Sequence, residues 1–333
     1  MARTMRNKSG LAVLNRFLSS PSLDLRRTTT TTRSLETLAF EEVRASTTTE
    51  KPYNFTAFVL HGLLGSGRNW RSFSRSLSSS LSNEWRLVLV DLRNHGRSAE
   101  IESLSPPHDM ANAAKDVADL VKSQGWAWPD VVLGHSMGGK VALQFAESCA
   151  RGDYGQSAQL PKQGQLWVLD SGPGKVNTEN SDGEVEKVLQ TLQSLPTSVP
   201  SRKWLVDHMI KLGFSKSLSE WIGSNLKKSG DHETWAFNLD GAVQMFNSYR
   251  ETDYWPLLEH PPKEMEIAIV QAEKSDRWDA DVIQRLESLA GRSLDECEGK
   301  FSVHVLPNSG HWVHVDNPKG LLEIVAPRIA SIA

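Results

Sequence analysis

The chain has 333 residues, of which 39% are hydrophobic and 23% are charged, so it is long enough to bury a large core. Its 37 basic and 40 acidic residues leave a formal charge of −3, which provides no field to hold nucleic acid or an anionic membrane. Two cysteines, Cys149 and Cys297, lack the spacing of a metal site and argue against a disulfide framework. No apolar run reaches the roughly 18 residues that a membrane-spanning helix needs.

Residues 1–50 differ in composition from the rest of the chain. Up to Ser34 they carry seven basic residues against the single acid Asp24, with abundant serine and threonine. Leucines at 11, 14 and 18 follow helical spacing, which suggests a short amphipathic helix. This composition predicts a disordered, removable transit peptide. Serine and threonine favour a chloroplast and the arginines favour a mitochondrion, so both organelles stay open as destinations.

From residue 51 onward, short apolar runs alternate with helix-length segments, which predicts a mostly parallel sheet flanked by helices. The predicted strands are 55–60, 87–90, 131–134, 166–169, 267–270 and 301–306. Residues 110–124 carry apolar side chains at helical spacing and predict a crossover helix between the second and third strands. Asp316 as N-cap and Pro318 in the first turn predict a last helix.

The alternation stops at residues 173–262, between two parts of the core at 51–172 and 263–333. Three helical segments are predicted there without intervening strands: 185–192, 204–209 and 218–226. Ser217 and Glu220 have the spacing of a capping box for the third segment. This stretch therefore predicts an inserted helical cap.

The cap contains three tryptophans at positions that leave two interpretations open. Trp204, Trp221 and Trp235 either line an acyl-binding pocket or pack the cap together. Packing is the commoner role for aromatic residues on helix faces, so it is the favoured interpretation.

Gly134-His135-Ser136-Met137-Gly138 matches the G-x-S-x-G nucleophile elbow. It follows a predicted strand and precedes a helical segment, which is the context that an α/β-hydrolase fold requires. A serine on so sharp a turn needs small residues two positions before and after it. We therefore predict Ser136 as a nucleophile, with the Met137 backbone N–H as one donor to a developing oxyanion.

A second oxyanion donor is predicted in His61-Gly62-Leu63-Leu64-Gly65, directly after the first predicted strand. Its glycines allow the Leu63 N–H to turn toward the elbow. Leu63 and Met137 are thus the predicted oxyanion pair, and His61 is expected to orient or pack.

The general base is predicted from chain order, which in this fold runs serine, acid, histidine. His311 lies on the loop after the last predicted strand and is the candidate. His304 lies within that strand and is expected to be structural, and His314 is expected at a helix entry or the surface.

Three aspartates compete for the role of triad acid. Asp276 follows the strand 267–270, the commonest place for this carboxylate, and Asp170 ends the strand 166–169, the known alternative. Asp240 in the cap is the third candidate. Chain order alone does not choose among them, because it gives no distance to His311.

The segments 90–98, 134–140 and 308–312 closely resemble the family of alpha/beta hydrolase domain-containing protein 11 and its bacterial esterase relatives. The resemblance covers residues from about 55 to the C-terminus. It implies a serine hydrolase of esterase type, in some members mitochondrial, with Ser136, His311, Leu63 and Met137 in the roles above. For the acid it favours Asp170 and Asp240.

The predicted function is hydrolysis of a small carboxylic ester or thioester, of lipid-like acyl type, through an acyl-enzyme. No cofactor, metal or nucleic acid is expected, and composition sets no oligomeric state. One alternative is a ligand receptor or interaction protein with vestigial turnover, and another is a lyase or transferase that uses the same triad. Epoxide or haloalkane hydrolysis is disfavoured because it would need aspartate in place of Ser136.

Overall fold

The computed structural model describes residues 36–45, 53–82, 84–158, 160, 163–176, 183–292 and 299–333. All of them belong to the unit Leu35–Ala333. Residues 1–35 and 46–50, which make up most of the predicted transit peptide, lie outside the described residues.

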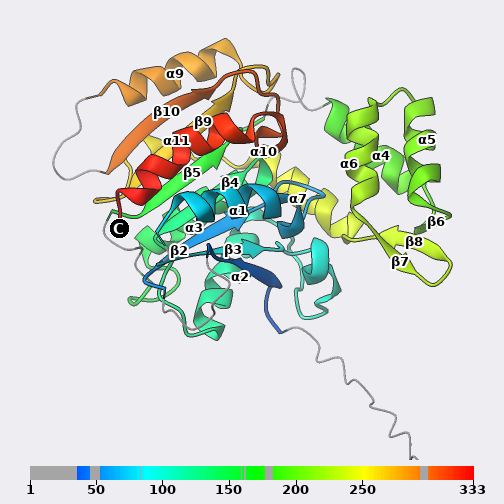
Figure 1. Cartoon of the computed structure of the whole chain (residues 1–333), viewed down its shortest axis with the longest axis horizontal. Coiled ribbons are helices and arrows are strands. Elements are labelled where there is room, and N and C mark those ends of the chain that lie inside the picture. The colour runs from blue at the N-terminus through cyan, green and yellow to red at the C-terminus, as the bar shows by residue number, and fades with distance from the viewer. Residues whose placement is uncertain are drawn as a thin grey trace, which may run out of the picture. The chain divides into compact units, whose positions relative to one another are not determined.

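A seven-stranded sheet forms the centre of the fold, in the order β1-β3-β2-β4-β5-β9-β10 (Figure 1). Six strands run parallel, and each contains one of the predicted strands. These six are β2 (Phe55–Leu60), β3 (Trp85–Val90), β4 (Val131–His135), β5 (Gln165–Leu169), β9 (Glu266–Ala272) and β10 (Lys300–Leu306). Their carboxyl ends meet at one edge of the sheet, which is where ligands bind in open α/β folds.

The edge strand β1 (Phe40–Val43) is antiparallel to β3 and lies within the segment expected to be a transit peptide. Leu38, Ala39 and Val43 are buried in the core. The predicted core boundary at residue 51 is therefore wrong, because an apolar run near residue 40 already contributes to the sheet.

Helices cover both faces of the sheet because strand side chains alternate between two apolar cores. One core packs α1 (Arg71–Ser80) and α11 (Pro318–Ala330) against residues such as Val59 and Leu133. The other core packs the remaining sheet helices: α2 (Met110–Ser123), α3 (Met137–Arg151) and α9 (Ala280–Ala290). The prediction of an α/β-hydrolase fold is confirmed.

Short helices complete this part of the fold: η1 (Gly67–Trp70), η2 (Gly96–Glu100) and α10 (Val313–Asp316). The last helix begins at Pro318, as predicted, but its N-cap is Asn317, whose side chain accepts the Gly320 N–H. Asp316 instead ends α10 and accepts the Gly310 N–H. The predicted N-cap of this helix is therefore one residue too early in the sequence.

The inserted cap contains strands as well as helices. Its elements are α4 (Gly183–Ser194), β6 (Ser198–Val199), α5 (Arg202–Lys211), α6 (Lys216–Ser224), β7 (Leu226–Ser229), β8 (His232–Trp235), α7 (Leu239–Glu251) and α8 (Trp255–Glu259). The three short strands form an antiparallel sheet, so the prediction of an all-helical cap is wrong in this detail. The N-cap of α6 is Ser215, which accepts the Leu218 N–H, rather than the predicted Ser217.

The cap is fastened to the core at its base. Lys140 on α3 is fully buried, and its ammonium donates to the backbone carbonyls of Gly174, Tyr249 and Thr252 at 2.7, 2.6 and 2.9 Å. These carbonyl oxygens accept hydrogen bonds from the buried ammonium, whose burial without such partners would cost much free energy of folding. The contact joins α3 to the segment after β5 and to the end of α7.

Candidate active site

Ser136 lies at the turn between β4 and α3, with φ 52° and ψ −121°. This is a strained conformation for a residue with a side chain, and surrounding contacts must hold it. A Cβ at Gly134 would clash with the Gly138 carbonyl, and one at Gly138 would clash with the carbonyls of Leu60 and His61. Both glycines are therefore required by close backbone approach, as the spacing of the motif predicts.

His311 lies on the loop between β10 and α10, and its Nδ1 is 2.7 Å from Asp170 Oδ2. Its side chain is 23% exposed, whereas that of Asp170 is fully buried. Burial and the nearby Arg277 lower the pKa of His311 below its ordinary value, although Asp170 opposes this shift. The imidazole is therefore neutral near pH 7 and can accept a proton.

Asp170 directly follows β5 and has a positive φ of 47°. Its Oδ1 accepts the Ala272 N–H at 3.0 Å and the Trp278 indole N–H at 2.6 Å. Its Oδ2 accepts the Ser275 hydroxyl at 2.7 Å in addition to His311. Burial alone would raise the pKa of Asp170, but the hydrogen bonds from His311, Ser275 and Trp278 hold it below the ordinary value.

The other two candidate acids lie elsewhere. Asp276 is exposed, in the turn whose neighbours Ser275 and Trp278 donate to Asp170. Asp240 is exposed in the first turn of α7. Of the three aspartates, the structure brings Asp170 to the imidazole of His311. The segment around Asp276 contributes to the site through Ser275 and Trp278, whose hydrogen bonds orient the carboxylate of Asp170.

The loop after β2 approaches the elbow closely. A Cβ at Gly62 would lie 3.2 Å from the Ser136 Cβ, so a larger residue would press on the serine. Leu63, the next residue, and Met137 line the same cavity as Ser136. The structure thus brings together the serine and the two residues predicted as oxyanion donors.

Two buried histidines hold this loop. The Leu64 N–H, on a residue with φ 57°, donates to His95 Nε2 at 3.0 Å, and the Leu92 N–H donates to His61 Nε2 at 3.0 Å. Burial lowers the pKa of His61 to about 4 and that of His95 to about 3. Both rings are neutral acceptors at Nε2, which agrees with the orienting role expected for His61. His95 was not predicted to hold the loop.

The polar segment 91–98 forms hydrogen bonds with three neighbouring elements: η1, α2 and the start of α7. Asp91 accepts the N–H groups of Gly67 and Arg97 at 2.8 and 3.0 Å. Arg93 forms a bidentate pair with Asp116, at 2.6 and 3.0 Å. The Asn94 carbonyl accepts the Asn238 N–H at 2.7 Å, so this segment also holds the start of α7.

The serine and His311 line one cavity of about 610 Å³. Its wall is apolar over much of its extent, and these residues form the apolar part: Leu63, Leu64, Trp70, Met137, Val185, Val188, Leu218, Trp221, Phe246, Tyr249, Trp312 and Val315. Among the three cap tryptophans, Trp221 lines this cavity, 5.9 Å from the Trp312 ring, whereas Trp204 stacks on His208 and Trp235 on Phe237. Trp221 therefore lies in the cavity wall, while the ring contacts of Trp204 and Trp235 are with other cap residues.

His314 and His304 differ in their surroundings. His314 is the second residue of α10, so of the two predicted places the helix entry is confirmed. The surface is not its place, because its ring stacks on Trp70 at 4.0 Å between centroids and lines the cavity. His304 on β10 packs near Trp167, in agreement with a structural role. Burial lowers the pKa of His314 to about 3, so this ring is neutral as well.

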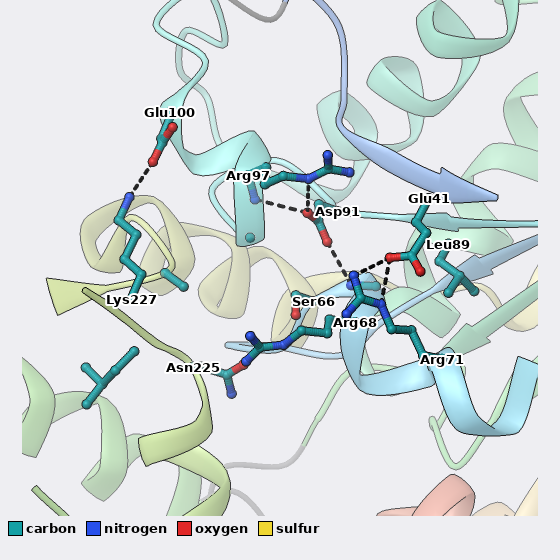
Figure 2. Close-up of a pocket in the computed structure, with 14 residues that line it drawn as sticks. Glu41, Ser66, Arg68, Arg71, Leu89, Asp91, Arg97, Glu100, Asn225 and Lys227 are labelled. Atoms are coloured by element: carbon teal, nitrogen blue, oxygen red, sulfur yellow. Dashed lines mark hydrogen bonds and ion pairs between the residues drawn. The ribbon is translucent and has the colours of Figure 1, made fainter. Parts of the chain in front are cut away.

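A second cavity of about 260 Å³, with several charged side chains in its wall, lies where the cap meets the core (Figure 2). Lys227 of β7 points toward Glu100, at 2.5 Å, and Arg71 pairs with Glu41. Arg68 donates to the Ser224 carbonyl at the end of α6. The contacts of Lys227 and Arg68 join the cap to the core, whereas the pair of Arg71 and Glu41 joins α1 to β1 within the core. Ser136 and His311 do not line this cavity.

No group of histidine, cysteine, aspartate or glutamate among the described residues has the geometry of a metal site. In the same part of the chain, no helix is both long and apolar enough to cross a bilayer.

The fold and the elbow define an α/β-hydrolase, and the comparison with known families agrees. Residues 57–324 match the alpha/beta hydrolase family, so the chain belongs to it. The mouse sn-1-specific diacylglycerol lipase ABHD11 is 25% identical over 274 residues, which cover 81% of this chain and 80% of the relative. A probable protein phosphatase methylesterase 1 of Caenorhabditis elegans is 27% identical over 277 residues, covering 80% and 67% of the two chains.

Solved structures show the same fold. A marine microorganism esterase superposes with a TM-score of 0.67 at 23% identity, over 87% of this chain and 98% of the esterase. The relatives are named as a lipase, a methylesterase and an esterase, and the chain is an enzyme of the serine hydrolase, esterase type.

Proposed function

We propose that the protein hydrolyses carboxylic esters or thioesters of apolar acyl groups, with Ser136, His311 and Asp170 as its triad. The observation that carries the proposal is the 2.7 Å contact between His311 Nδ1 and a fully buried Asp170, with His311 and the strained Ser136 lining one cavity. A neutral imidazole held in this way presents its Nε2 lone pair to a hydroxyl.

In the proposed reaction, Ser136 Oγ attacks the substrate carbonyl while His311 Nε2 takes its proton. The backbone N–H groups of Leu63 and Met137 bind the oxyanion. The imidazolium, stabilised by Asp170, then protonates the departing alkoxide or thiolate. Water, deprotonated by His311, attacks the acyl-serine and releases the carboxylic acid and the free hydroxyl.

An apolar acyl group suits the cavity, because side chains from α4, α6 and α7 of the cap and from loops of the core make much of its wall apolar. A cavity of about 610 Å³ is of the size that binds small organic ligands. The lipase relative is named for an acylglycerol, an apolar acyl ester of this kind. These observations favour a lipid-like acyl ester as substrate.

The test is the Ser136→Ala variant, assayed with a series of p-nitrophenyl esters from acetate to decanoate and with a fluorophosphonate probe. We expect loss of turnover and of covalent labelling, with unchanged circular dichroism. Labelling that persists in this variant would refute the assignment of the nucleophile. The matched control is Ser76→Ala, which removes an exposed serine hydroxyl on α1 and should leave both readouts unchanged.

We also propose that residues 1–34 direct the protein to a chloroplast or mitochondrion, on the basis of their basic, acid-poor composition. A fluorescent protein fused to residues 1–50 should enter one of these organelles. A variant with its arginines changed to glutamate should stay in the cytosol, and equal distribution of both fusions would contradict the proposal.

A further inference from the structure

His135 is the last residue of β4 and directly precedes the serine of the elbow. Its side chain is buried, with the residue only 4% exposed. The G-x-S-x-G pattern leaves this position open, and the proposed reaction gives it no role. Its contacts nevertheless reach the other parts of the site.

The Nε2 of His135 lies 2.7 Å from the backbone carbonyl oxygen of His311. A carbonyl only accepts, so Nε2 carries the hydrogen and donates. The same carbonyl also accepts the Val313 N–H at 3.0 Å. Burial, reinforced by the neighbouring His311 and His314, lowers the pKa of His135 well below its ordinary value, so the ring remains neutral with its hydrogen on Nε2.

Packing adds to this hydrogen bond. The His135 ring lies 4.7 Å from the His311 ring and 5.6 Å from the Trp70 ring, measured between centroids. A Cβ at Gly62 would lie 3.1 Å from His135 Nδ1, so the ring also abuts the loop that carries Leu63. His135 thus precedes Ser136 in the sequence, and its side chain hydrogen-bonds to the backbone of His311 and packs against the loop that carries Leu63.

We propose that His135 is a positioning residue that sets the orientation of His311 toward Ser136, a role that rests on the proposed function. Asp170 holds the imidazole of His311 at Nδ1, and His135 holds the peptide group of the same residue. With both ends fixed, the free Nε2 of His311 has little freedom to turn away from the serine. Precise placement of reacting groups of this kind raises kcat more than it affects substrate binding.

The test compares two substitutions at His135. His135→Phe keeps a ring but removes the donor, and His135→Gln keeps an N–H donor of similar reach. We expect the Phe variant to lower kcat about tenfold, the upper range for a lost neutral hydrogen bond, with KM changed less than about twofold. The Gln variant should recover kcat to within about threefold of wild type.

Ser136→Ala, assayed in parallel, separates the two proposals. If it is inactive while His135→Phe keeps wild-type kcat, the proposed function stands and the role of His135 is refuted. If the two His135 variants lose kcat equally, the donor is not what matters and the proposal is equally refuted. Recovery in the Gln variant alone supports it.

A measurement on the wild-type protein decides the matter should the Phe variant not fold. In a sample with ¹⁵N-labelled histidine, the His135 ring should show the Nε2–H tautomer from pH 5 to 9 without titrating, with its signals assigned by their loss in His135→Gln. A hydrogen on Nδ1, or protonation within this range, would overturn the proposal.

Discussion

Changing Asp170 to asparagine is the most informative perturbation of the site. The carboxylate accepts four hydrogen bonds, two at each oxygen. The asparagine oxygen can replace Oδ1, where the Ala272 and Trp278 N–H groups donate, which leaves its NH₂ facing His311 Nδ1. An NH₂ group donates, so His311 must place its own hydrogen on Nε2, where it can no longer accept the serine proton.

The magnitude follows from this change of tautomer. In a serine protease, the same substitution at the triad acid lowers kcat by about 10⁴-fold, which corresponds to roughly 5.4 kcal/mol at about 1.36 kcal/mol per tenfold. We expect a loss of this order in kcat for a p-nitrophenyl ester, with a fold that remains intact because the asparagine keeps the shape of the aspartate.

The matched control is Asp276→Asn, which removes the neighbouring exposed carboxylate and should change kcat less than about twofold. The assay is steady-state turnover near pH 8, with unfolding midpoints measured for both variants. A large loss in Asp276→Asn together with normal turnover in Asp170→Asn would refute the assignment of the acid.

Three further predictions concern pH, stability and substrate choice. Because the pKa of His311 is lowered from its ordinary value of 6.5 and its neutral form is the proposed base, kcat/KM should rise with pH through a midpoint below 6.5; a midpoint at 7 or above in a pH profile would contradict this. Lys140→Met should lower the free energy of unfolding by roughly 3 kcal/mol in urea titrations, since it removes the ammonium donor from three backbone carbonyls, and an unchanged midpoint would refute the bracing role. Trp221→Ala should lower kcat/KM for an octanoate ester about tenfold and for an acetate ester less than about twofold, with Trp204→Ala as the control that changes neither; equal losses for both esters would rule out an acyl contact.

Much of the fold could be predicted because its signals are local. Five of the six parallel strands are short apolar runs, and burial on both faces produces that pattern. The edge strand β10 is only partly buried, but its alternating Phe301, Val303 and Val305 still indicate a strand. Strand β1 was missed because Glu41 and Glu42 interrupt its apolar pattern at the sheet edge. Strands β7 and β8 were missed because they are short and largely polar.

The candidate site also has a part that local sequence signals predict and a part that depends on the fold. Ser136 and His311 are predicted from a motif and from chain order, which a sequence displays directly. The choice between Asp170 and Asp276 depends on three dimensions, because β5 and β9 are neighbours and both carboxylates follow strands at the same edge. What separates them is the set of donors from Ser275 and Trp278, which no spacing rule contains.

The buried ammonium of Lys140 limits how the enzyme can admit its substrate. Gly174 lies where the chain leaves the core for the cap, and Tyr249 and Thr252 lie near its return. The side chain of Lys140 therefore connects both crossings to α3, the helix that begins directly after Ser136. Because the cap is held at both crossings, we expect that it does not move away from the core as one rigid body. Residues of α4 and α6 line the cavity, and neither helix takes part in the Lys140 contact. We therefore expect substrate entry to involve displacements of these two helices that leave the turn at Ser136 in place.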